Sequence, residues 1–256
     1  MIDLSIEGSV ASLILNNPSA NTFTAAALEQ LSKLIDELNA NAGVRSAVIT
    51  GAGEKFFSAG ADLKEFATGD KVHARLMAQR FGDAFEKLQN ARFVTIAAIN
   101  GYAMGGGLEC ALACDIRVCE EQAQMALPEP SVGLLPCGCG TQTLPWLVGE
   151  GWAKRMILTN ERLDAATALR IGLVEQVVPR GQARSTALDM AKRVATLSPR
   201  AVEASKILLH QARLGTPRPA ALALEREEFI DLFDGADQLE GVNAFLEKRK
   251  PAWRGA

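Results

Sequence analysis

Apolar residues in the first hundred positions fall into short runs that predict buried strands. Three such runs, rich in β-branched residues and bounded by Asn or Gly, cover residues 10–15, 44–50 and 93–99. Runs of this length between polar turn residues are typical of strands that are covered on both faces. We therefore expect these segments to be buried strands.

Helical periodicity separates these runs. After Thr24, a residue type that commonly caps helix N-termini, apolar residues recur at helical spacing as far as residues 41–43. They are Leu28, Leu31, Leu34, Ile35 and Leu38. A second, less regular stripe consists of Val72, Leu76, Phe81, Phe85 and Leu88. Because parallel strands need crossover connections, strands that alternate with helices predict a mainly parallel α/β fold.

The pattern changes beyond residue 197, where helical periodicity continues without strands. Three helices are predicted over residues 201–214, 220–233 and 239–248, separated by short segments rich in Pro and Gly. A helical region of about 60 residues is too small to bury much core by itself. We therefore divide the chain into a core, residues 1–196, and a helical region, residues 197–256, that packs on the core or on a neighbouring subunit.

Composition narrows the class of protein. The 256 residues are 48% hydrophobic and carry a formal net charge of −3, as expected for one large globular domain. A slightly acidic chain offers no broad basic face, so we expect no nucleic-acid partner. No apolar segment is long enough for a membrane span, and the first residues lack the pattern of a leader, so we expect a cytoplasmic protein without a membrane partner. The five cysteines do not form a disulfide or metal-binding pattern.

Two glycine-rich segments follow predicted strands and are the first candidates for chemistry. They cover residues 51–64 and 100–109. Small residues let a ligand approach the backbone, and N–H groups that open a helix point toward developing negative charge. The two segments could together form an oxyanion hole. On the pattern alone, the simpler interpretation is that both segments are tight turns in a packed domain. Neither segment matches a dinucleotide-binding or phosphate-binding loop.

Two glutamates lie in unusual surroundings. Glu109 follows three glycines and precedes an apolar helix start, and Glu129 lies between two prolines. A carboxyl group among apolar residues has a raised pKa when it is buried, which suits general acid–base catalysis. Taken singly, Glu109 could instead be stabilised by the dipole of its own helix, and Glu129 could be a solvated turn residue.

Other chemistries find less support in the sequence. His73 and His210 lie in predicted helices among polar residues, where we expect solvated side chains. Motifs for zinc hydrolases and for serine nucleophiles are absent. Cys137 and Cys139 precede a helix, where a thiol can be reactive, but small buried apolar side chains are the more common role. We expect no metal site.

Taken together, these motifs resemble the crotonase superfamily, which contains the enoyl-CoA hydratases and isomerases. The resemblance extends over nearly the whole chain. It rests on residues 57–64, on residues 100–109 followed by 114–117, on residues 133–136 and 140–142, and on residues 245–251 near the end. Residues 136–144 depart from the pattern of many hydratases in having Cys137 and Cys139, and Trp146 stands where a basic residue is common.

The resemblance implies a fold and a set of residue roles. The fold would be a spiral of ββα units with a C-terminal helical region that builds a homotrimer, often paired as a hexamer. The N–H groups of Ala61 and Gly106 would form the oxyanion hole, and Glu109 and Glu129 would be the catalytic acids. The residues implied in binding the substrate and its coenzyme A moiety are Ala59, Ala61, Asp62, Leu63, Lys64 and Gly106.

The implied reaction is the reversible addition of water to a 2-enoyl-CoA thioester, with coenzyme A as part of the substrate and no separate cofactor. Hydration needs one carboxylate to activate water and a proton source for Cα. The alternatives are an enoyl-CoA isomerase, a thioester hydrolase or decarboxylase, and a catalytically silent acyl-CoA-binding protein. Proline directly after Glu129 restricts the backbone that aims its carboxyl group.

Overall fold

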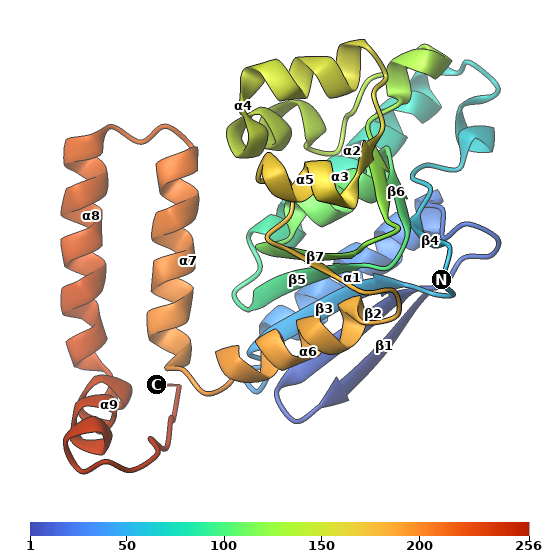
Figure 1. Cartoon of the computed structure of the whole chain (residues 1–256). Helices are drawn as coiled ribbons and strands as arrows, with labels where there is room; N and C mark the ends of the chain where they lie inside the picture. The colour runs from blue at the N-terminus through green and yellow to red at the C-terminus, as the bar shows by residue number, and fades with distance from the viewer. Residues whose placement is uncertain (256) are drawn as a thin grey trace.

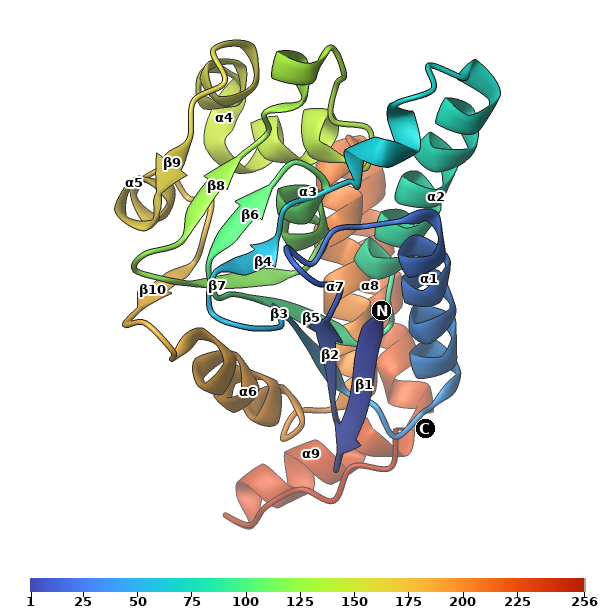
Figure 2. The same ribbon diagram turned by 90° about the vertical axis from the view of Figure 1, so that its right-hand side faces the viewer.

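The computed structural model describes residues 1–255 and shows a repeated β–β–α arrangement (Figures 1 and 2). Four such units follow one another along the chain, which confirms the expected ββα spiral. Their helices are α1 (Ala25–Ala40), α2 (Lys71–Gln89), α3 (Gly106–Ala113) and α4 (Gly140–Leu158). Two 3₁₀ turns, η1 (Leu63–Phe66) and η2 (Glu129–Val132), precede α2 and α4.

The strands of these units divide between two sheets. A six-stranded sheet has the order β1 (Ile2–Glu7), β2 (Val10–Leu15), β3 (Ser46–Gly51), β5 (Val94–Ile99), β7 (Ile116–Glu120) and β10 (Gln176–Val178). A four-stranded sheet has the order β4 (Phe56–Ser58), β6 (Tyr102–Met104), β8 (Gln124–Ala126) and β9 (Leu163–Asp164). All pairs are parallel except β1–β2 and β8–β9. The prediction of a mainly parallel α/β fold is therefore confirmed, and the three predicted strands are β2, β3 and β5.

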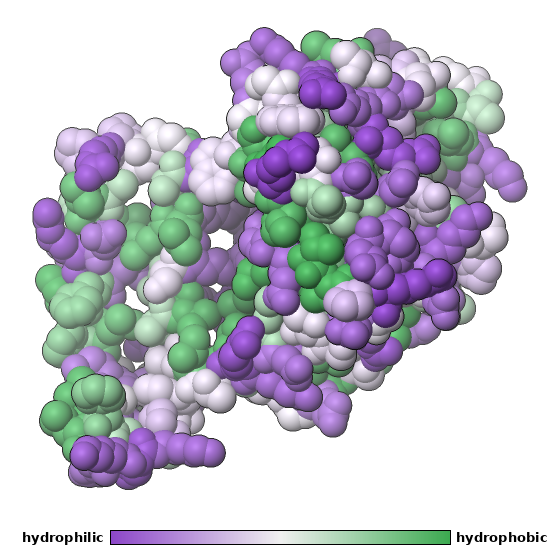
Figure 3. Space-filling view, viewed as in Figure 1, coloured by the Kyte–Doolittle hydropathy of each residue, from purple (hydrophilic) through white to green (hydrophobic). Residues whose placement is uncertain are grey.

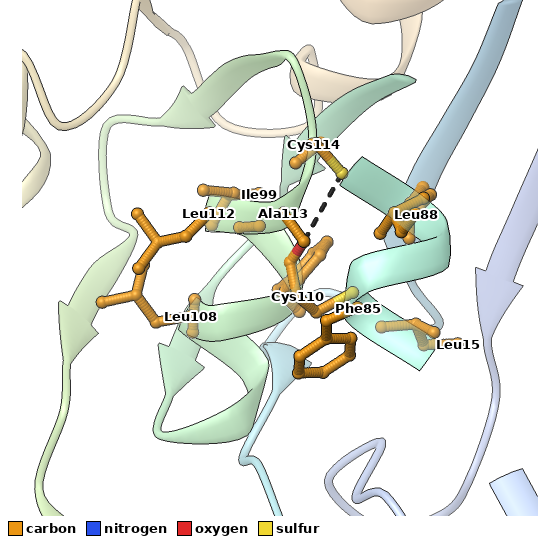
Figure 4. Close-up of a cluster of buried hydrophobic side chains, with 14 of the residues drawn as sticks. Leu15, Phe85, Leu88, Ile99, Leu108, Cys110, Leu112, Ala113 and Cys114 are labelled. Carbon is orange, nitrogen blue, oxygen red and sulfur yellow. Dashed lines mark hydrogen bonds between the residues drawn. The ribbon is translucent and has the colours of Figure 1, made fainter. Parts of the chain in front are cut away.

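The central core lies between the large sheet and helices α1, α2 and α3. Thr24 caps α1 through its hydroxyl, which accepts a hydrogen bond from the Ala27 N–H at 3.2 Å, as expected from the sequence. All eight residues of α3 are buried. Figure 4 shows this helix inside an apolar cluster, where the Cys114 thiol donates to the Cys110 carbonyl. A helix that is apolar on all sides is enclosed on all sides, so α3 is a rigid support for the residues at its start.

The apolar stripe predicted for α2 is only partly buried. Phe81, Phe85 and Leu88 lie in the core, but Val72 and Leu76 in the first turns are exposed. The first turns of α2 extend beyond the core at one rim of the molecule (Figure 2). The buried face predicted from periodicity was therefore too long at its N-terminal end.

Two further helices complete the body, and the remaining ones form a separate tail. The body ends with α5 (Ala165–Arg170) and α6 (Ala183–Val194), and the tail contains α7 (Pro199–Arg213), α8 (Arg218–Asp231), η3 (Leu232–Asp234) and α9 (Ala236–Leu246). Figure 1 shows α8 and α9 standing away from the body. The ion pair between Lys206 Nζ and Asp115 Oδ2, at 2.8 Å, attaches α7 to the body. None of the helices in residues 1–255 is both long and apolar enough to span a membrane.

Candidate active site

The two glycine-rich segments meet at the small sheet. β4 and β6, which belong to one segment each, pair as parallel strands. The backbones approach so closely that a Cβ atom on Gly107 would lie 2.3 Å from the Ser58 carbonyl oxygen, and one on Gly60 would lie 2.6 Å from that of Met104. Glycine is required at these positions because no other residue leaves room for the opposing backbone.

Ala61 and Gly106 each present a backbone N–H at this junction. Phe23 forms a parallel bridge with Ala61, using the Gly60 carbonyl and the Asp62 N–H as its hydrogen-bond partners at 2.7 and 3.0 Å. Because successive peptide groups of an extended chain face opposite sides, the Ala61 N–H faces away from Phe23. Gly106 is the first residue of α3, where a helix leaves the N–H without an internal acceptor. Neither N–H donates to an acceptor within residues 1–255. Both are therefore available to a ligand.

The distance between the two segments is short at this point. A Cβ atom on Gly60 would lie 3.0 Å from the Gly106 nitrogen, so the residue before Ala61 contacts the residue that opens α3. Two N–H groups from adjacent backbones can receive one oxygen atom that carries negative charge. The simpler interpretation as a turn holds at Gly105, which precedes α3 with a φ of 53°, and the two interpretations are compatible.

Glu109 is buried and bound to the start of a different helix from its own. Its Oε1 accepts hydrogen bonds from the N–H groups of Gly138, Cys139 and Gly140, at 2.9, 3.0 and 2.8 Å. Burial raises the pKa of the Glu109 carboxyl group, and the three hydrogen bonds oppose that rise. The expected stabilisation by a helix dipole therefore comes from α4 rather than from α3.

Glu129 faces the same region from η2. A Cβ atom on Gly105, the residue before α3, would lie 2.7 Å from Glu129 Oε1. The Oε2 atom is buried, and no group in residues 1–255 forms a hydrogen bond with it. Burial raises the pKa of Glu129 to about 7; its own backbone N–H opposes the rise, and the charge of Glu109 adds to it. The interpretation as a solvated turn residue is wrong.

The other residues implied in substrate binding lie along one rim of this site. Asp62 caps η1 by accepting a hydrogen bond from the Lys64 N–H at 3.1 Å. Leu63 and Lys64 are exposed, and Ala59 is partly exposed. All four residues lie within three positions of Ala61.

Sequence reasoning missed the role of two buried asparagines that hold the first glycine-rich segment. The Asn100 side chain donates to the carbonyls of Gly51 and Gly53, at 3.0 and 2.8 Å, and accepts from the Gly51 N–H at 3.1 Å. Asn21 donates to the carbonyls of Ala52 and Phe56, at 3.0 and 2.9 Å. The sequence signal for Asn100 was its place between a predicted strand and a glycine. Asn21 lies about 30 residues before the segment that it holds, so the sequence carried no signal for its role.

The remaining candidates lie apart from this arrangement or differ from expectation. His73 pairs with Glu65 at 3.0 Å, and His210 lies on α7. Cys137 is exposed, so its interpretation as a buried apolar side chain is wrong. No cluster of potential ligands in the part of the chain that the structure describes could hold a metal ion.

Comparisons with known proteins agree with one another. A family model described as enoyl-CoA hydratase/isomerase matches residues 5–256. A short-chain-enoyl-CoA hydratase of Clostridium acetobutylicum is 38% identical over 245 residues, covering 95% of this chain and 94% of that protein. The structure of Pseudomonas aeruginosa DspI is 61% identical, with a TM-score of 0.97 and coverage of 99% and 96% of the two chains. An enoyl-CoA hydratase of Bacillus anthracis superimposes with a TM-score of 0.96 at 36% identity, covering 100% of this chain and 99% of that one.

Proposed function

This chain belongs to the enoyl-CoA hydratase/isomerase family, and on that premise we propose that it adds water reversibly to a 2-enoyl-CoA thioester. The observation that carries the proposal is the convergence of Glu109 and Glu129 beside the Ala61 and Gly106 N–H groups. The family hosts several reactions on a shared fold, so the acid and base groups decide between them. Two carboxyl groups fit a reaction that must remove one proton and deliver another.

In this proposal the Ala61 and Gly106 N–H groups bind the thioester oxygen. When hydroxyl oxygen adds to Cβ, the electron pair of the double bond moves toward the carbonyl, and the oxygen gains negative charge. Both N–H groups are fixed by the backbone before substrate binds, and such preorganised donors typically lower a barrier by about 3 to 4 kcal/mol each.

The two glutamates divide the proton transfers. Burial raises the pKa of both carboxyl groups, but at Glu109 three N–H donors oppose the rise, so we assign Glu109 as the base that takes a proton from water. The pKa of about 7 at Glu129 leaves it protonated in a substantial fraction of molecules near neutral pH, so it is assigned as the acid that protonates Cα. Environments that act differently on two neighbouring acids are the usual basis of such a division.

One observation favours an isomerase as a second candidate. Oε1 of Glu109 is fully engaged by α4, whereas Oε2 of Glu129 has no partner among the described residues. A single carboxyl group such as that of Glu129 could move a proton between two carbons without adding water.

The test is turnover of short-chain, medium-chain and branched 2-enoyl-CoA thioesters with products identified by mass. The hydratase produces a water adduct, and Glu109→Gln and Glu129→Gln each lower kcat about a hundredfold or more with KM little changed. Glu121→Gln is the matched control, because Glu121 is exposed and lies in the turn between β7 and β8. An isomer of unchanged mass, with activity surviving in Glu109→Gln, would support the second candidate; free acid would indicate a thioesterase. Binding without any turnover would indicate a catalytically silent member.

The binding residues follow from the same proposal. Ala59 is assigned to the adenine side of coenzyme A, and Asp62, Leu63 and Lys64 to the path between adenine and thioester. The exposed Lys64 side chain suits an anionic coenzyme A group as a point charge.

We also propose that the tail assembles the chain into a homotrimer, with pairing of trimers as a further step. Large apolar side chains of the tail are exposed in the single chain, among them Leu209, Phe229, Phe233 and Phe245. Figure 3 shows apolar residues gathered over α8 and α9. Another copy of this chain is the occupant that a helical assembly region implies. Light scattering distinguishes trimer, hexamer and monomer.

A further inference from the structure

The helix that holds Glu109 is weak by its own sequence. α4 is interrupted at Gly149, whose φ of 79° is outside the helical range, so its first segment spans only residues 140–148. Pro145 lies within that segment and has no N–H to donate to the carbonyl of Thr141. Isolated helices of this length are marginal in water even without proline. Contacts with other elements must therefore keep this segment in place.

The position of this segment matters because its start binds Glu109. The N–H groups of Gly138, Cys139 and Gly140 all converge on one carboxylate oxygen. A displacement of the first turn by a fraction of a hydrogen-bond length would weaken all three bonds together.

One face of the segment meets two other helices. Cys139, Thr143 and Trp146 are spaced by four and three residues, which places them on the same face. From α2, Gln89 donates to the Thr143 hydroxyl at 3.1 Å. From α7, the Arg213 guanidinium lies over the Trp146 ring, 5.7 Å from its centroid. The charge of Arg213 also reaches the Cys139 thiol, where it opposes the strong rise in pKa caused by burial.

The contact between Arg213 and Trp146 bridges an otherwise open region. A cavity of about 340 Å³ separates α7 from the body, lined by residues that include Gln89, Lys206 and His210. Figure 3 shows this hollow beside the tail. Lys206 attaches α7 on one side of it, and Arg213, two helical turns farther along α7, reaches α4.

We propose that Arg213 is a positioning residue for Glu109, acting through Trp146 and the first turn of α4. Its guanidinium stabilises residues 140–148, which Pro145 and Gly149 make a weak helix. This segment in turn holds the Glu109 carboxylate in place. The inference rests on the proposed role of Glu109 only for its effect on turnover. Its effect on the start of α4 does not depend on any reaction.

The first test is hydrogen–deuterium exchange of the peptide that contains residues 138–148, in protein without substrate. Arg213→Gln is expected to speed exchange there by about two- to fivefold, the range of an exposed cation–π contact. Arg213→Lys should restore part of the protection, because a lysine ammonium can also form a cation–π contact with tryptophan. Arg184→Gln on α6 is the matched control, since Arg184 is exposed and distant from α4. Unchanged exchange in Arg213→Gln would overturn the proposal.

The second test is the split between kcat and KM. Arg213→Gln should lower kcat by about two- to fivefold and leave KM within twofold, since Arg213 acts on Glu109 and not on substrate binding. Trp146→Leu removes the same cation–π contact but leaves α7 unaltered. It therefore serves as a second variant if Arg213→Gln disturbs assembly. An equal fall of kcat in Arg184→Gln would contradict the proposal. Faster exchange in an enzyme that never hydrates enoyl thioesters would refute the proposed function and leave the positioning role standing.

Discussion

Replacing Glu129 by glutamine should make the folded protein more stable at alkaline pH while lowering kcat about a hundredfold or more. The reason is the buried Oε2 atom, which has no hydrogen-bond partner among residues 1–255. Burial raises the pKa of Glu129 from 4.5 to about 7, so the folded state favours the protonated form. The stabilisation associated with Glu129 is complete below pH 4.5, falls as the pH rises toward 7, and is absent above it.

The size of the effect follows from the same pKa difference. Each pH unit of difference corresponds to about 1.4 kcal/mol, which sets an upper bound of about 3 kcal/mol above pH 7. Part of the side chain contacts solvent, so screening reduces the expected value to about 1.5 kcal/mol. For a chain of this size that amount shifts the melting temperature by about 3 to 6 °C.

The assay compares calorimetric melting temperatures of wild type and Glu129→Gln at pH 5 and pH 8.5, at one protein concentration. Glutamine does not titrate, so its effects on packing and hydrogen bonding are the same at both pH values. The quantity of interest is therefore how much the difference in melting temperature between the two proteins changes from pH 5 to pH 8.5. Glu121→Gln, at an exposed position, controls for the loss of a surface charge. A difference that is the same at both pH values would refute the placement of Glu129 as a buried, unpartnered acid.

Three further predictions concern the same site. The value of kcat/KM for hydration should fall above about pH 7, as Glu129 loses its proton. A flat profile from pH 6 to 9 would contradict its role as the acid. Dehydration should show the same fall at alkaline pH, because Glu109 and Glu129 together hold one proton in both directions. Asn100→Ala should lower the free energy of unfolding by about 2 to 4 kcal/mol in denaturant titrations, since buried groups of Gly51 and Gly53 lose their partners; a change as small as that of Asn90→Ala, at an exposed helix end, would argue against this. Gly107→Ala should lower both activity and melting temperature, because its Cβ would lie 2.3 Å from the Ser58 carbonyl oxygen, and near-native kinetics would show that the two segments need not touch.

The sequence alone determined the class of fold, three strands of the large sheet and the helices with the clearest periodicity. Buried strands and amphipathic helices are specified by local periodicity, so β2, β3 and β5 and the three long helices of the tail were found within a few residues. The short strands of the small sheet were missed, because strands of two or three residues carry no periodicity. Strands β1, β7 and β10 of the large sheet were not predicted either. The resemblance, by contrast, rested on ordered motifs along the chain, and the family comparison confirms it.

Only the tertiary structure decided how the candidate groups are used. The sequence showed Glu109 beside three glycines, but the N–H groups that bind it come from residues about 30 positions later. It showed no partner for Trp146, which meets Arg213 across the gap between tail and body. The pKa of Glu129 likewise depends on its burial and on the groups packed around it. Periodicity encodes which face of a segment is buried, whereas hydrogen bonding and desolvation depend on which distant segments the folded chain brings together.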